Sequence, residues 1–219
     1  MRLTKYTHSC VRLDDADASV VIDPGSFSGE AELRAALDGV DAVLVTHEHA
    51  DHLDVASMTQ LLAERHSLRV WGPSPVAELL ADVRDQVVVV GPGESFAAGG
   101  LPVSTHGGQH ALIHPSIPIV PNVAYVVGEP GRDAVLHPGD CLLAVPQPVE
   151  TLLLPLHAPW SSVGDVLDHL IAVRAPQIHQ IHDGLLNERG RAVVEGHVHR
   201  VSKEYGSHYT PLQIGQTAN

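Results

Sequence analysis

The feature that most constrains this 219-residue chain is a short stretch in which four side chains are able to bind a metal ion. The stretch reads Thr46-His47-Glu48-His49-Ala50-Asp51-His52. The apolar run 42–45 before it predicts a buried strand, and the helical spacing of apolar residues over 53–66 predicts a helix after it. A turn between a strand and a helix lets side chains converge, and imidazole and carboxylate donors favour zinc, iron or manganese. The sequence therefore predicts a metal site at this turn.

Composition narrows the range of partners. The chain has 16 histidines against 13 lysines and arginines, and its net charge is −13. Without a basic run, the chain lacks the cations that bind nucleic-acid phosphates or an anionic membrane, so we expect a small-molecule substrate, with no nucleic acid and no membrane. Residues 1–8 contain no long apolar segment, so we expect no signal peptide and a cytoplasmic location. Cys10 and Cys141 predict buried, reduced thiols, although Cys141 follows Asp140 and thus could lie beside the metal.

The pattern of apolar segments indicates sheets with helices packed outside them. Segments 3–13 and 18–22 predict two strands around the polar turn 14–17. Later strands alternate with helices, including a helix over 161–174 with Ser161 as its N-cap. Neither a repeat nor a Gly/Ser linker divides the chain, so we expect one domain over residues 1–219.

The motif His47-x-His49-x-Asp51-His52 resembles the signature of the metallo-β-lactamase-fold superfamily of metal-dependent hydrolases. Three later segments resemble the family's remaining motifs in their usual order, each after a predicted strand: Gly107-Gly108-Gln109-His110, His137-Pro138-Gly139-Asp140 and Ile181-His182-Asp183-Gly184. The resemblance implies an α+β fold, a four-layer αββα sandwich of the metallo-β-lactamase type.

The resemblance also implies two metal sites that share one carboxylate. The first ion would be held by His47, His49 and His110, the second by Asp51, His52 and His182, and Asp140 would bridge them. Residue types alone leave His106, His110 and His114 open as the third ligand, and the Gly-Gly-x-His frame of the family selects His110. The implied cofactors are two divalent metal ions, with zinc first and manganese or iron as alternatives.

Further residues have predicted roles around these ligands. Asp23 resembles the family's Asp-Pro segment and would hold the outward nitrogen of a ligand histidine, or else only end a strand. His157 and Trp160 share a loop, where they would protonate the leaving group and bind substrate, or simply pack the loop. His8 resembles a first-strand histidine of the branch that includes ascorbate-6-phosphate lactonase, and His8 and His114 are predicted to contact substrate.

The implied activity is hydrolysis by a hydroxide that bridges two metal ions, with Asp51 or Asp140 orienting it. We expect a small-molecule ester, lactone or amide as substrate, with a phosphodiester as an alternative. The compact branch resembling ascorbate-6-phosphate lactonase fits the chain best, because His49 argues against the flavodiiron branch. Two other classes remain open: a mononuclear iron oxidoreductase of the persulfide dioxygenase type, and a non-catalytic metal-binding module. The apolar loop 111–122 predicts a lid or an interface.

Overall fold

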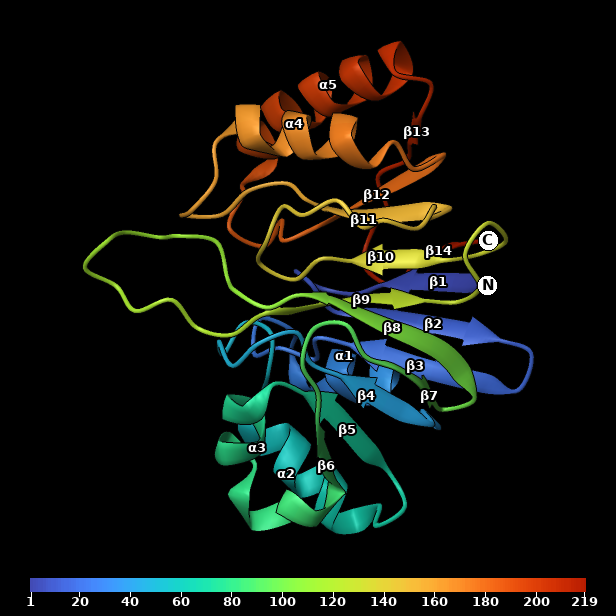
Figure 1. Cartoon of the computed structure of the whole chain (residues 1–219), viewed down its shortest axis with the longest axis vertical. Helices are drawn as coiled ribbons and strands as arrows, with labels where there is room; N and C mark the ends of the chain where they lie inside the picture. Colours follow the sequence, from blue (N-terminus) through green and yellow to red (C-terminus); the bar gives the residue numbers. More distant parts are fainter.

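Two seven-stranded sheets face each other in the computed structural model, which describes residues 1–219, and helices cover both outer faces (Figure 1). The predicted four-layer αββα arrangement is confirmed. No helix combines the length and the apolar character needed to span a bilayer.

The first sheet has the order β14-β1-β2-β3-β4-β5-β6. Its strands are β1 (Arg2–Lys5), β2 (Val11–Asp15), β3 (Ala18–Ile22), β4 (Ala42–Leu44), β5 (Arg69–Gly72), β6 (Val87–Val89) and β14 (Thr217–Ala218). The strands from β3 to β6 run parallel to one another.

The second sheet has the order β13-β12-β11-β10-β9-β8-β7. Its strands are β7 (Ser95–Ala98), β8 (Leu101–Gly107), β9 (Val123–Val127), β10 (Val135–His137), β11 (Thr151–Pro155), β12 (Gln177–Ile181) and β13 (His208–Tyr209). Here the strands from β10 to β13 are parallel.

The helices divide into two groups along the chain. Those of the first half are α1 (Glu30–Leu37), α2 (Val55–Glu64), α3 (Ser74–Leu79) and the 3₁₀ helix η1 (Ala81–Gln86), and those of the second half are α4 (Val163–Val173) and α5 (Glu188–Glu204). The first group covers the outer face of the first sheet, and α4 and α5 cover the outer face of the second sheet (Figure 1).

Three apolar clusters correspond to the three interfaces of the four layers. The central cluster joins residues of both sheets, among them Ile22 and Leu44 from the first and Tyr125 and Leu153 from the second. One outer cluster packs α1 and α2 on the first sheet, and the other packs α4 and α5 on the second. Strands such as β4 are therefore buried on both faces, which explains why they are apolar without alternation.

Two local predictions are wrong. The segment 3–13 is not one strand, because Tyr6 and Cys10 hydrogen-bond across a tight turn that separates β1 from β2. Helix α4 begins after Ser162 rather than Ser161. The Ser162 hydroxyl accepts from the backbone N–H of Asp165, whose carboxylate accepts from the N–H of Ser162, and this reciprocal pair fixes the start of the helix.

The parallel strands of both sheets end at the same edge of the sandwich. Asp23 follows β3, residues 46–52 follow β4, Asp140 follows β10, and His182 follows β12. The segment between β8 and β9 extends beyond the sheets (yellow-green in Figure 1) and exposes four apolar side chains: Leu112, Ile113, Ile117 and Ile119.

Candidate metal centre

The loops at this edge bring the predicted ligands into two neighbouring groups. In the first group, the ligand atoms of His47, His49, His110 and Asp140 all lie within 4.8 Å of one another. His47 Nε2 is 3.1 Å from His49 Nδ1, and His110 Nε2 is 3.2 Å from Asp140 Oδ2. His47 and His49 follow a strand of the first sheet, and His110 and Asp140 follow strands of the second sheet. The ends of these strands bring the four side chains together.

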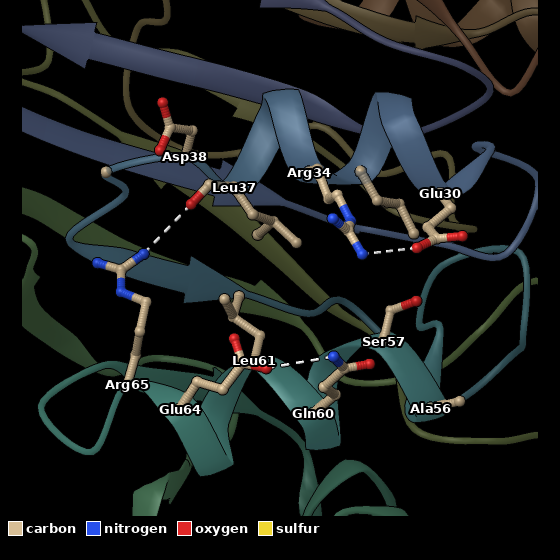
Figure 2. A pocket seen from close by; sticks show the side chains of 12 residues that line it. Glu30, Arg34, Leu37, Asp38, Ala56, Ser57, Gln60, Leu61, Glu64 and Arg65 are labelled. Atoms are coloured by element: carbon tan, nitrogen blue, oxygen red, sulfur yellow. Dashed lines mark hydrogen bonds and ion pairs between the residues drawn. The ribbon is translucent and has the colours of Figure 1, made fainter.

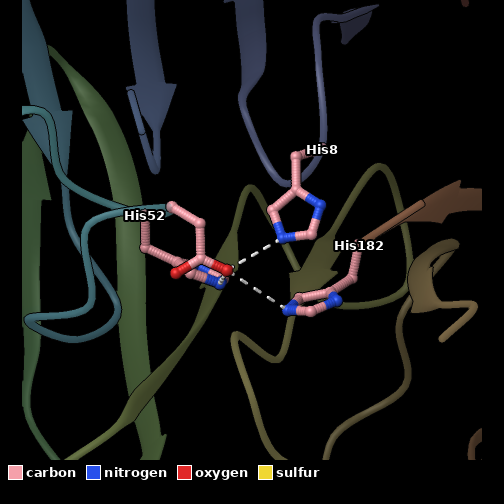
Figure 3. A group of neighbouring side chains, drawn as sticks. His8, His52 and His182 are labelled. Carbon is pink, nitrogen blue, oxygen red and sulfur yellow. Dashed lines mark hydrogen bonds and ion pairs between the residues drawn. The ribbon is translucent and has the colours of Figure 1, made fainter. Parts of the chain in front are cut away.

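The second group consists of His8, Asp51, His52 and His182, whose ligand atoms also lie within 4.8 Å of one another (Figure 3). Asp51 Oδ2 is 3.8 Å from Nε2 of both His52 and His182. The structure thus brings together all seven residues that the motifs select, and adds His8 to the second group.

Asp140 lies between the two groups. Its Oδ1 is 3.1 Å from His52 Nε2, and its Oδ2 is 3.2 Å from Nε2 of both His110 and His182. The residue is 3% exposed, so these contacts are made in a site with little water. One carboxylate therefore faces histidines of both groups, as a bridging ligand must.

The outward nitrogens of three histidines are bound to oxygen acceptors. Nδ1 of His52 is 2.6 Å from Asp23 Oδ2. Nδ1 of His110 is 2.6 Å from the Ala111 carbonyl oxygen, and Nδ1 of His182 is 2.6 Å from the His157 carbonyl oxygen. Because an oxygen acceptor requires a proton on Nδ1, the neutral ring carries a lone pair on Nε2. In each case Nε2, the ring nitrogen left for a metal ion, faces Asp140.

Two buried atoms at the centre, which have no hydrogen-bond partner, indicate that the site suits a cation. His52 Nε2 and Asp140 Oδ1 are buried and have no hydrogen-bond partner, although they are 3.1 Å apart. Buried polar atoms are ordinarily satisfied, and a lone pair beside a carboxylate is what a metal ion would satisfy. The donor set of imidazoles and carboxylates fits zinc, manganese or iron.

Asp23 and Thr46 hold the ligand turn in place through hydrogen bonds. Asp23 accepts from the backbone N–H and the hydroxyl of Thr46, both at 2.7 Å. The Thr46 oxygen can then accept from Nδ1–H of His47, 3.0 Å away, which leaves His47 Nε2 facing the centre. Gly25 allows this packing, because a Cβ there would lie 1.8 Å from the Asp51 carbonyl oxygen.

The electrostatics keep the carboxylates ionised. Burial opposes ionisation of Asp140, but His52, His110 and His182 outweigh it and hold its pKa well below the usual range. For Asp51, burial is likewise outweighed by the hydrogen bond from His8 and by His52, which lower its pKa to about 2. Burial drives the pKa of His47 well below its ordinary value, so this ring is neutral. His52 differs: burial lowers its pKa, but Asp140 and Asp23 outweigh burial and raise that pKa well above the ordinary value, so a metal ion would have to displace a proton from this ring. Charged carboxylates and neutral imidazoles are the forms that bind metal.

Trp160, His157 and His114 differ in how close they come to the centre. The Trp160 indole N–H donates to Asp140 Oδ2 at 2.9 Å. His157 is half-buried and contributes its carbonyl to His182. His114 is in the exposed loop, where its Nδ1 is 2.7 Å from the Ser116 hydroxyl, outside both ligand groups.

Sequence reasoning missed Lys5, a buried cation behind the centre. Its Nζ donates to Asp183 Oδ1 at 3.1 Å and to the Tyr6 carbonyl at 2.8 Å, and Asp183 also pairs with Arg191. The available signal was a lysine inside a segment predicted as a strand, in a chain with only one other lysine, Lys203. As predicted, Cys10 and Cys141 are buried and unpaired, and Cys141 donates to the Pro138 carbonyl rather than joining the ligands.

A separate hollow of about 780 Å³ lies between α1 and α2 (Figure 2). Its polar groups pair with one another: Arg34 with Glu30, Gln60 with Glu64, and Arg65 with the Leu37 carbonyl. No residue of the two ligand groups lines it. The chemistry therefore resides at the histidine cluster.

Comparisons with known proteins agree with this geometry. The β-lactamase superfamily domain matches residues 2–182. Protein Rv0786c of Mycobacterium tuberculosis is 33% identical over 197 residues, 90% of each chain. A UPF0173 metal-dependent hydrolase of Xanthobacter autotrophicus is 31% identical over 150 residues, 64% of this chain and 62% of its own length.

Among solved structures, Igni18, a metallo hydrolase from the archaeon Ignicoccus hospitalis, matches with a TM-score of 0.74 at 17% identity. The match covers 99% of this chain and 97% of Igni18, and it shows a shared fold. Because the domain match spans most of the sequence and includes every residue of both ligand groups, the chain belongs to the β-lactamase superfamily.

Proposed function

We propose that this protein is a binuclear metal-dependent hydrolase of small molecules. One observation carries the proposal: Nε2 of His52, of His110 and of His182 lies 3.1–3.2 Å from Asp140, while the Nδ1 of each ring is bound to another oxygen. The name of the Xanthobacter relative, a metal-dependent hydrolase, supports the same activity.

The residues divide the chemistry between them. Two bound divalent ions would lower the pKa of a shared water and polarise the bond to be cleaved. His47, His49 and His110 would hold one ion, Asp51, His52 and His182 the other, and Asp140 both, as the two ligand groups allow. Asp51 or Asp140 would orient the attacking water, and the half-buried His157, whose carbonyl accepts from His182, would donate the proton to the leaving group.

The substrate class is proposed from the surroundings of the centre. Trp160, whose indole N–H donates to Asp140, also lines a cavity of about 490 Å³, whose other walls include Ala111, Leu142, Asp168 and His169. A cavity of this size suits a small molecule. We propose an ester, lactone or amide, as in the branch resembling ascorbate-6-phosphate lactonase, with Trp160 and His114 contacting the substrate and zinc as the metal. A phosphodiester, and manganese or iron, are the alternatives.

The remaining predictions from composition complete the proposal. The net charge of −13 supports a small substrate over nucleic acid or an anionic membrane. A cytoplasmic location is part of the same proposal.

The test is a substrate panel assayed on protein reconstituted with zinc or manganese. The panel contains lactones, esters, amides and phosphodiesters, and each is also assayed with Asp140→Asn and with the exposed His199→Ala as a matched control. We expect hydrolysis of a carbonyl substrate that Asp140→Asn loses and His199→Ala retains. Turnover of phosphodiesters alone would overturn the carbonyl assignment. A metal-loaded protein that hydrolyses nothing, or oxidises a persulfide in its iron form, would contradict the proposed hydrolase.

A further inference from the structure

His8 differs from the ligand histidines in the position of its ring proton. Its Nδ1 accepts a hydrogen bond from the backbone N–H of Gly184, at 3.1 Å. A neutral imidazole that accepts at Nδ1 carries its proton on Nε2. That Nε2 is 3.1 Å from Asp51 Oδ2, so His8 donates to the carboxylate (Figure 3). In His52, His110 and His182 it is Nδ1 that donates, in each case to an oxygen.

The ring of His8 is held rigidly in this orientation. Its backbone has φ 60°, its carbonyl accepts from the N–H of His182 at 3.2 Å, and its ring centroid is 4.0 Å from that of His182. A Cβ at position 184 would lie 3.0 Å from His8 Nδ1, so the close approach of this N–H depends on glycine. The side chain of His8 has no exposed surface, which leaves it no face for a substrate.

Asp51 depends on this hydrogen bond for its orientation. Its side chain lies on a turn and is 22% exposed, and His8 is its one hydrogen-bonding partner. A half-buried carboxylate on a turn is otherwise free to rotate toward water. Partners that fix a metal-binding side chain are worth about 10- to 100-fold in metal affinity.

We infer that His8 is a positioning residue of the metal centre: it donates its Nε2 proton to Asp51 and thereby holds that carboxylate in place for the second ion, binding neither the ion nor the substrate. The inference rests on the proposed two-metal centre. The tautomer of His8, with its proton on Nε2, is expected whether or not a metal ion is bound.

Two substitutions separate the functions of the two ring nitrogens. In His8→Gln, the longer side-chain amide reaches the place of Nε2 and keeps a donor for Asp51. In His8→Asn, the shorter amide reaches the place of Nδ1, keeps an acceptor for Gly184 and loses the donor. Asparagine also tolerates positive φ well, so His8→Asn preserves the turn.

The first measurement is ¹⁵N NMR of the histidine rings in the chelator-treated protein and after zinc loading. We expect His8 to be protonated on Nε2 in both samples, and His52, His110 and His182 to be protonated on Nδ1. A His8 Nε2 that lacks a proton, or that shifts as a ligand when zinc is added, would overturn the inference.

The second measurement is the affinity for the second equivalent of zinc, by competition with a chelator. We expect His8→Asn to weaken it by about 10- to 100-fold and His8→Gln to recover most of that loss. If both variants lost the same zinc affinity, His8 would be a metal ligand. If His8→Gln lost more zinc affinity than His8→Asn, the function of His8 would be to accept the hydrogen bond from Gly184. Either result overturns the inference. A wild-type protein that binds no zinc refutes the proposed function instead, while the NMR result still decides the tautomer.

Discussion

Asp23 Oδ2 lies 2.6 Å from His52 Nδ1, and both side chains are completely buried. The same carboxylate accepts two hydrogen bonds from Thr46, so it fixes the start of the ligand turn and the orientation of its last histidine. The metal centre thus depends on a residue that ends a different strand.

Asp23→Asn tests this dependence. The amide keeps the shape of the carboxylate but loses its charge and one acceptor, so the His52 imidazole becomes less basic and less firmly oriented. We expect the affinity for the second metal ion to fall by about 10- to 100-fold. Isothermal titration or chelator competition would measure it, with the exposed Asp38→Asn as control. Unchanged affinity in Asp23→Asn would show that the contact only ends the strand.

Asp140→Asn removes the charge that faces both ligand groups. Because the variant keeps the side chain's shape, we expect a folded protein by circular dichroism. Turnover of the substrate found in the panel should fall by about 100-fold or more, the scale expected on removing one preorganised electrostatic group. Rates near those of the wild type would contradict a mechanism that needs both ions.

Asp183→Asn tests the buried pair behind the centre. The Lys5 side chain is 3% exposed, and the substitution leaves its ammonium group without a carboxylate. Breaking a buried pair in this way costs about 3–5 kcal/mol. We expect a loss of this size in urea unfolding, and a smaller loss in the double variant Lys5→Met/Asp183→Asn. If adding Lys5→Met to Asp183→Asn lowered the free energy of unfolding by as much as Lys5→Met does in the wild-type protein, the two residues would be energetically independent.

His169 gives the free energy of unfolding a pH dependence of its own. Burial lowers its pKa from 6.5 to about 4, and neither ring nitrogen has a hydrogen-bond partner in the protein. Below pH 6.5 the unfolded chain binds this proton and the folded protein does not. Folding is therefore disfavoured progressively as the pH falls from about 6.5 to 4, by up to about 3 kcal/mol.

His169→Leu should remove that dependence. We expect the stability difference between variant and wild type to grow in favour of the variant from pH 7 to pH 4.5, as followed by denaturant unfolding. The exposed His199→Leu serves as the control and should show no such trend. A constant difference across this range would mean that the pKa of His169 is the same in the folded protein and in the unfolded chain.

The residues around His47 predict a metal site by themselves, but the full ligand set follows from the resemblance to the metallo-β-lactamase-fold superfamily, because residue types alone leave His106 and His114 open beside His110. The four layers follow from the same resemblance, whereas the apolar segments indicate only sheets with helices packed outside them. The exact start of α4 could not be predicted, since Ser161 and Ser162 are both good caps and the choice depends on the Asp165 side chain.

The roles of His8 and Lys5 depend on contacts far along the chain. The N–H that fixes the His8 ring belongs to Gly184, and the carboxylate that pairs with Lys5 belongs to Asp183. Local patterns contain no information on either contact, so a tautomer or a buried pair of this kind requires the structure.

The most direct test of the two-metal centre is the metal content per chain, by elemental analysis of protein purified without chelator or nickel affinity. We expect about two equivalents of zinc or manganese, with the content reduced in His110→Ala and unchanged in the exposed His66→Ala. About one equivalent of iron would favour oxygen chemistry on the same fold. A folded protein that contains no metal and takes up neither zinc nor manganese would contradict the account.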